Sequence, residues 1–152
     1  MQPKSNFGIM KCIHITIPTH TMKKGFKINI EKATVANENF RRVLYTGEKS
    51  QLVLMTLQPG EEIGLEIHAE NDQFFRFESG AGKVVINEET YEVGDGDAVI
   101  VPAGAQHNVI NLSDSETLNL YTLYSPAHHK DQIVHATKAD EKEEDFDGQT
   151  TE

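Results

Sequence analysis

The chain has 152 residues and a formal charge of −10 at pH 7, with 38% hydrophobic and 25% charged residues. That length suits one hydrophobic core, and no apolar run approaches the roughly 18 residues that a membrane span needs. The acidic balance leaves no basic stripe for phosphate contacts. We therefore expect one soluble domain that binds neither a membrane nor a nucleic acid.

The N-terminal residues 1–25 are read as an extension of this domain. They carry early lysines, but no small-residue cleavage pattern follows, so we expect no secretory signal. Apolar and polar residues alternate over 13–18, which predicts an extra strand. The single cysteine, Cys12, cannot form an internal disulfide, and this favours a cytoplasmic location.

Short strands with turn residues between them follow in chain order. The expected strands are 26–30, 41–45, 52–57, 64–68, 73–78, 83–86, 90–93, 98–101, 109–112 and 118–124. Turn signals such as Pro59-Gly60 recur roughly every 8 to 12 residues, and helical periodicity is scarce. This rhythm predicts an all-β sandwich or barrel over residues 26–138.

The C-terminal residues 139–152 hold much of the negative charge. From Asp140 to Glu152 there are seven acidic residues, one lysine and one large apolar side chain, Phe146. Such a composition buries too little apolar surface to offset the entropy of ordering. We expect an acidic disordered tail without a partner, with docking onto another surface as the alternative.

Two spaced sets of residues resemble the two motifs of the cupin superfamily. The first set is Gly60, Glu66-Ile67-His68, Gln73 and Gly80, and the second is Gly96, Pro102, Gly104, His107 and Asn111. The likeness is greatest to small stand-alone cupins of the kind often labelled mannose-6-phosphate isomerase-like. It implies a double-stranded β-helix, or jelly-roll barrel, that encloses one site, and it implies a homodimer, for which the 13–17 strand is available.

The motif residues differ from the usual cupin pattern of three histidines and one glutamate. Glu66 stands where the first histidine would be, and Gln73 stands where the glutamate would be. Residues i and i+2 of a strand share a face, so Glu66 and His68 point together, and Gln73 and His107 join them from neighbouring strands. The expected metal ligands are therefore Glu66, His68, Gln73 and His107.

Two imidazoles and one carboxylate suffice for a divalent transition metal, with the amide oxygen as a weak fourth ligand. The set predicts one such ion and leaves its identity open among zinc, manganese, iron, nickel and cobalt. In the alternative reading, these four side chains only hydrogen-bond to one another inside a polar pocket.

Other residues near the motifs have two readings each. Phe75 and Phe77 share the parity of Gln73 and are expected to fill the core rather than line a pocket. Tyr124 and Glu66 are the candidate catalytic residues. His128, His129 and His135 are expected to be solvated loop residues, with proton carriers at the barrel mouth as the alternative.

Cupins include enzymes and binding modules, so the fold does not choose a function. The leading hypothesis is a metal-dependent, isomerase- or epimerase-like enzyme acting on a small polar, carbohydrate-like ligand. A neutral sugar or a hydroxy acid suits the scarcity of basic residues better than a phosphosugar does. The alternatives are a non-haem iron(II) dioxygenase and a non-catalytic cupin that binds a small ligand.

Overall fold

The structure, a computed structural model, describes residues 22–152; the expected strand at 13–18 and Cys12 lie outside them. The pairing of that strand between subunits therefore stays a prediction. The elements in chain order are α1 (Ile30–Val35), β1 (Arg41–Thr46), β2 (Gln51–Leu57), β3 (Glu66–Ile67), β4 (Asp72–Ser79), β5 (Ala81–Ile86), β6 (Glu89–Gly94), β7 (Ala98–Val101), β8 (Gln106–Asn111), β9 (Leu118–Ser125), β10 (Val134–His135) and a 3-10 helix, η1 (Lys138–Asp140).

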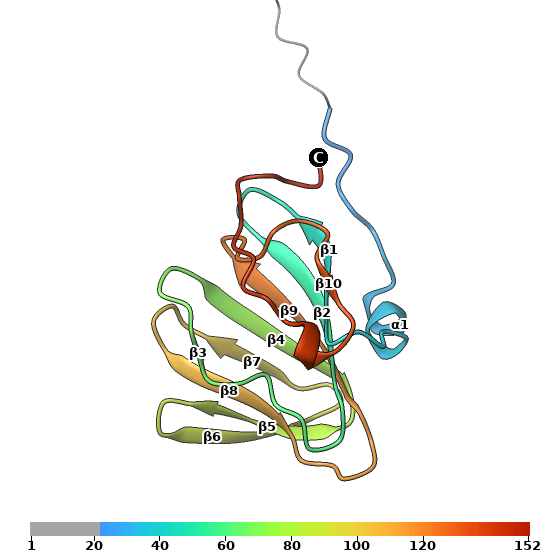
Figure 1. Cartoon of the computed structure of the whole chain (residues 1–152), viewed down its shortest axis with the longest axis vertical. Coiled ribbons are helices and arrows are strands. Elements are labelled where there is room, and N and C mark those ends of the chain that lie inside the picture. The colour runs from blue at the N-terminus through green and yellow to red at the C-terminus, as the bar shows by residue number, and fades with distance from the viewer. Residues whose placement is uncertain (1–21) are drawn as a thin grey trace, which may run out of the picture.

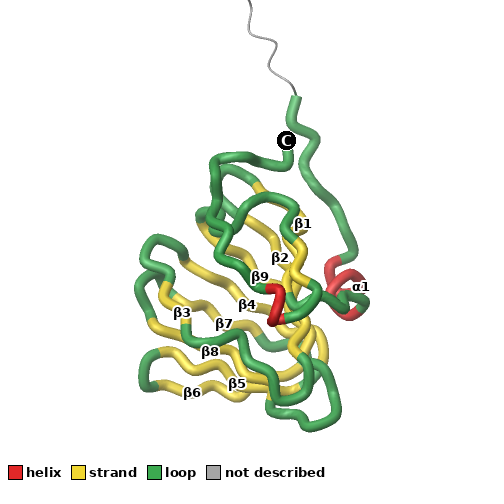
Figure 2. Tube along the Cα trace, in the orientation of Figure 1, coloured by secondary structure: helices red, strands yellow, loops and turns green. Residues whose placement is uncertain are grey.

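The strands form two antiparallel sheets. A large sheet has the order β10-β1-β2-β9-β4-β7, and a small sheet has the order β3-β8-β5-β6 (Figure 1). The short helices lie outside the two layers (Figure 2). This arrangement confirms the predicted all-β class and is that of a double-stranded β-helix, with nine of the ten expected strand positions falling on observed strands.

The core lies between the sheets and includes side chains of both. Along β4, Gln73, Phe75 and Phe77 are almost completely buried while Phe74 and Arg76 are half-buried, so the strand turns alternate residues inward. Phe75 and Phe77 join one hydrophobic cluster with residues of the small sheet, such as Val84. Each fully buried phenylalanine stabilises the fold by about 2–3 kcal/mol. The prediction that both residues fill the core is confirmed.

The prediction of a strand at 26–30 is wrong. A one-and-a-half-turn helix, α1, begins at Ile30 instead, because the Asn29 side chain accepts a hydrogen bond from the Lys32 N–H (3.1 Å) and so caps it. Before the helix, Phe26 stacks on Tyr45 at 5.4 Å between ring centroids rather than pairing as a strand. Within residues 22–152, no helix is long and apolar enough to cross a membrane.

The C-terminal segment, residues 139–152, differs from the disordered tail that its composition favours. It follows η1, crosses the large sheet and ends near β1 (Figure 1), where the Thr151 N–H donates to the Thr46 carbonyl (2.9 Å). None of its residues is buried, so hydrogen bonds and ion pairs hold it rather than apolar packing. A composition argument counts apolar area, and it misses polar attachment of this kind.

Two motif residues act on the fold rather than on the site. The buried Asn111 amide donates to the carbonyls of Leu57, Gln58 and Glu116, which fixes the loops at one end of the barrel. Gly80 has a φ of +87°, and an added Cβ would lie 2.9 Å from Leu118 Cα and closer still to the Thr117 carbonyl oxygen. The β4–β5 turn therefore packs directly on the start of β9.

Gly80→Ala is expected to lower the free energy of unfolding by about 3 kcal/mol, because it adds a backbone clash to the strain of positive φ. Gly60→Ala is the matched control: Gly60 also has positive φ, +71°, but an added Cβ would meet nothing within 4 Å. It should cost about 1 kcal/mol. Urea unfolding followed by circular dichroism measures both, and equal losses would contradict the close packing at Gly80.

Candidate metal centre

Three ligand atoms converge between β3 and β8. The ligand atoms of Glu66, His68 and His107 all lie within 4.8 Å of one another. The antiparallel register places Glu66 directly opposite His107, and His68 follows two residues after Glu66 on the same face. The structure thus brings together three of the four residues predicted as ligands, from one edge of the small sheet.

The fourth predicted ligand, Gln73, reaches the same point from the large sheet. It lies on β4, it is 1% exposed, and its Oε1 is 3.0 Å from His107 Nε2. The other end of its amide, Nε2, is buried without a hydrogen-bond partner among the described residues. The donor set therefore spans both sheets of the barrel.

The hydrogen bond of His107 Nδ1 determines which ring nitrogen carries the proton. His107 Nδ1 is 3.1 Å from the Ala105 carbonyl oxygen, which only accepts, so Nδ1 carries the proton and Nε2 presents a lone pair. Burial holds the pKa of His107 below its usual value, which keeps the ring neutral near pH 7. Two lone pairs, from His107 Nε2 and Gln73 Oε1, then face each other without a proton between them.

Glu66 supplies the negative charge of the centre. Its Oε2 lies 3.3 Å from His68 Nε2 and 3.8 Å from His107 Nε2. Burial alone would raise the pKa of Glu66, but the hydrogen bond with His68 and the charges of His68 and Arg41 outweigh it and lower the pKa. Glu66 is therefore a carboxylate at neutral pH.

These donors fit a divalent transition metal. Two imidazole nitrogens, a carboxylate and an amide oxygen are ligands that such ions accept, and the opposed lone pairs of His107 and Gln73 are what a shared cation satisfies. A pocket held only by hydrogen bonds is the alternative, and it requires the Gln73 amide to be turned over so that Nε2 donates to the lone pair of His107 Nε2.

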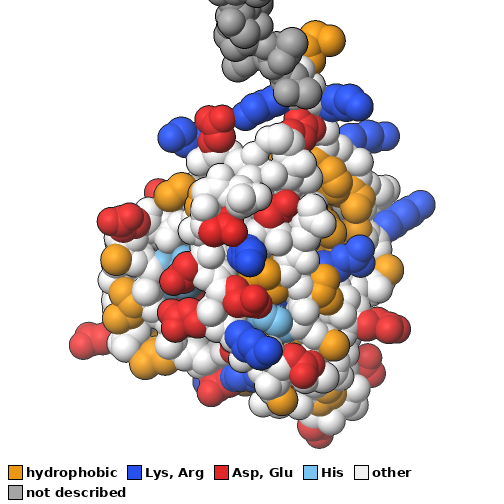
Figure 3. Space-filling model, turned by 45° about the horizontal axis from the view of Figure 1, so that its top comes forward, with side chains coloured by type: hydrophobic (Ala, Val, Ile, Leu, Met, Phe, Trp, Pro, Cys, Tyr) orange, Lys and Arg blue, Asp and Glu red, His pale blue; other side chains and the backbone are white. Residues whose placement is uncertain are grey.

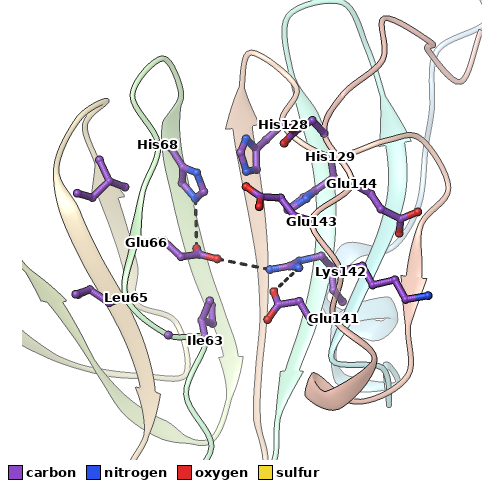
Figure 4. Close-up of a pocket in the computed structure, with 14 residues that line it drawn as sticks. Ile63, Leu65, Glu66, His68, His128, His129, Glu141, Lys142, Glu143 and Glu144 are labelled. Atoms are coloured by element: carbon purple, nitrogen blue, oxygen red, sulfur yellow. Dashed lines mark hydrogen bonds and ion pairs between the residues drawn. The ribbon is translucent and has the colours of Figure 1, made fainter.

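A cavity of about 400 Å³ opens beside the centre. Glu66 and His68 lie on one wall and His128, Glu141 and Glu143 on the other (Figure 4). Acidic side chains gather on this face of the molecule next to exposed histidine surface (Figure 3). Residues 141–145 of the C-terminal segment form part of the rim.

Arg41 is the residue of the site that the sequence analysis missed. It is 2% exposed on β1, and its guanidinium lies between two carboxylates: Nη1 is 2.6 Å from Glu141 and Nη2 is 3.7 Å from Glu66. In Figure 4, two dashed lines that join the unlabelled guanidinium to Glu66 and to Glu141 mark these ion pairs, and the third dashed line joins Glu66 to His68. The sequence did contain a signal, because Arg41 and Val43 are two residues apart on one strand and therefore point to the same, buried face.

The interpretation of the late histidines as solvated loop residues is wrong for His129 and His135, whereas His128 is half-buried and lines the cavity. His129 and His135 are 7% and 5% exposed, and His128, on the cavity wall, has its ring centroid 4.2 Å from that of His68. Burial, followed by the charge of His68, lowers the pKa of His128 to about 4. The buried amide of Gln51 fixes this loop, because it donates to the His129 carbonyl and accepts from the His129 N–H.

Tyr124 lies behind these rings rather than on the cavity wall. It is 1% exposed, its hydroxyl is 3.3 Å from His129 Nε2, and its ring stacks on His128 at 5.2 Å. Burial, together with the Glu66 charge, raises its pKa, so the phenol keeps its proton at neutral pH. Its contacts orient the histidines.

Known proteins resemble the chain along most of its length. YrkC, an uncharacterized protein of Bacillus subtilis (strain 168), is 46% identical over 123 residues, which cover 77% of this chain and 66% of YrkC. L612, an uncharacterized protein of Acanthamoeba polyphaga mimivirus, is 42% identical over 107 residues, covering 68% of this chain and 67% of L612. The chain thus spans about two thirds of the length of these curated relatives.

A solved structure is also similar. The crystal structure of BH2720 from Bacillus halodurans superimposes with a TM-score of 0.75 and 43% identity, covering 80% of this chain and 95% of that one. The cupin domain family matches residues 53–124, which include every motif residue from Glu66 to Asn111. The motifs, the two sheets that carry them and these relatives agree, and the chain belongs to the cupin family.

Proposed function

We propose that this cupin is a metal-dependent enzyme that acts on a small polar substrate, carbohydrate-like or a hydroxy acid, by an isomerase- or epimerase-like reaction. The observation that carries the proposal is the convergence of Glu66, His68 and His107 beside a cavity of about 400 Å³. That volume suits a ligand of few atoms.

The charges around the cavity support a substrate with little charge of its own. The lining has two cations, Arg41 and Lys142, against five carboxylates, and Arg41 is already engaged by Glu66 and Glu141. A phosphate dianion is usually bound by a cluster of arginines or by a helix N-terminus, and the lining has neither. A neutral sugar or a monocarboxylate is the better match.

The chain's own residues divide the work of such a reaction. A divalent ion bound by Glu66, His68, Gln73 and His107 would supply Lewis acidity to a substrate oxygen. His128 lines the cavity beside His68 and is the group placed to move a proton to or from the substrate. Tyr124 holds the His128 ring from behind, and we assign it a positioning role.

A non-haem iron(II) dioxygenase is the second candidate. Two histidines and one carboxylate, here His68, His107 and Glu66, are the donor set of such enzymes. The two candidates differ in their need for oxygen. Oxygen uptake by the iron-loaded protein in the presence of substrate would favour the dioxygenase, whereas turnover without oxygen would favour the isomerase-like enzyme.

Protein purified without a tag or chelator is expected to hold about one equivalent of a divalent metal by inductively coupled plasma mass spectrometry. The double variant His68→Ala/His107→Ala should lose it, because one ligand of the remaining pair is a weak amide. His135→Ala is the control, since His135 is equally buried but lies outside the donor set, and it should retain the ion.

Circular dichroism shows whether each variant stays folded. A folded double variant that keeps the ion would place the metal elsewhere. Metal-free wild-type protein that also fails to take up added metal would contradict the proposed function.

Gln73→Leu is expected to weaken metal binding about tenfold without abolishing it, because it removes the weakest donor and the partner of His107. Competition with a fluorescent chelator measures the affinity. Gln73→Glu keeps an oxygen at the same place and should bind the ion at least as tightly as the wild type. Equal affinity in all three proteins would mean that Gln73 is not a ligand.

A further inference from the structure

The guanidinium of Arg41 has unused hydrogen-bonding capacity. It makes one hydrogen bond, from Nη1 to Glu141 Oε1 (2.6 Å), and one longer ion pair, from Nη2 to Glu66 (3.7 Å). Its Nε is buried without a partner among the described residues. Guanidinium has five N–H donors in a planar fork that suits a carboxylate bound by two of them. The Arg41 guanidinium can therefore donate to a further acceptor, such as a second carboxylate.

The carboxylate that accepts the hydrogen bond of that fork belongs to the C-terminal segment. Glu141 follows η1, lines the cavity and is 28% exposed at its side chain. The segment is attached by few contacts here: Lys130 N–H donates to the Glu144 carbonyl (2.9 Å), Phe146 N–H donates to the His128 carbonyl (2.8 Å), and His135 pairs with Glu144 (3.3 Å). A segment without buried residues opens at low free-energy cost.

The charges explain why an anion is needed at this point. Arg41 is almost completely buried, and a buried cation must be compensated. Glu66 alone compensates it only while the carboxylate is free of other cations. When Glu66 also serves a divalent ion, Arg41 requires a second carboxylate, and Glu141 is the one that the chain itself provides.

The position of Glu66 between Arg41 and His68 also limits the length of a ligand that could replace Glu141 on Arg41. One of its oxygens is 3.7 Å from Arg41 Nη2 and the other is 3.3 Å from His68 Nε2, so a single carboxylate group separates the arginine from the metal ligands. A molecule that reached both would carry its carboxylate and an oxygen donor within two or three carbon atoms.

We propose that Arg41 is the substrate anchor of this cavity, that Glu141 is an internal ligand which the substrate displaces, and that the substrates are small 2-hydroxy or 2-oxo monocarboxylates. This inference rests on the proposed function, since the metal centre takes the hydroxyl or carbonyl end. The C-terminal segment thereby closes the empty site and yields to a carboxylate of the right length.

The test compares glycolate binding to the full chain and two variants by isothermal titration calorimetry. Glu141→Gln removes the internal competitor, and Glu143→Gln removes an equal charge from the same rim, which the contacts of the structure do not pair with Arg41. If Glu141 occupies Arg41 about nine-tenths of the time, its loss raises the apparent glycolate affinity about tenfold. Glu143→Gln should change it less than twofold, and glycolamide, which has no charge, should gain nothing in either variant.

Hydrogen exchange gives a second reading on the wild type. Glycolate should speed exchange at the amides of Lys130 and Phe146, because both donate across the junction that the C-terminal segment makes with the loop before it. If Glu141→Gln and Glu143→Gln changed the glycolate affinity equally, the effect would come from the net charge of the rim, and the inference would be overturned. Exchange rates at Lys130 and Phe146 that glycolate leaves unchanged would also overturn it. The metal content of the same samples is measured separately, so failure of the metal centre is distinguished from failure of the Arg41 anchor.

Discussion

The partly buried carboxylate of Glu66 is the group on which the site depends. A charge in this position persists only if partners compensate it. Three elements supply them: the turn after β3 brings His68, β8 brings His107, and β1 of the opposite sheet brings Arg41. The register between β3 and β8, only two residues long, therefore fixes where an arginine, two histidines and an amide meet.

Most of the barrel could be predicted because its signals are local. Alternation identified the strands, as with Gln73, Phe75 and Phe77 on β4, and the motif spacing identified the residues that converge. The helix after Asn29 was missed because one capping hydrogen bond decided between two weak patterns. Local signals also gave no partner for Arg41, since Glu141 lies 100 residues further along the chain.

The late histidines illustrate the same limit. The His129 ring packs against its neighbours His128 and Tyr124, but the position of its backbone is set by the amide of Gln51, 78 residues earlier, through two hydrogen bonds. The motif residues, by contrast, separate into two kinds once the fold is known. Gly80 and Asn111 maintain close backbone packing and loop geometry, and only Glu66, His68, Gln73 and His107 meet at the centre. A motif match alone does not make this division.

The split of the donor set between the two sheets has a mechanical consequence. Glu66 and His107 belong to the small sheet, His68 directly follows its edge strand β3, and Gln73 belongs to the large sheet, so the barrel is joined there by side chains rather than by strand pairing. An ion shared among them would act as a cross-link at the open end of the sandwich. Its binding free energy would then add to the free energy needed to separate the two sheets. The lifetime of the folded protein would therefore depend on the supply of metal.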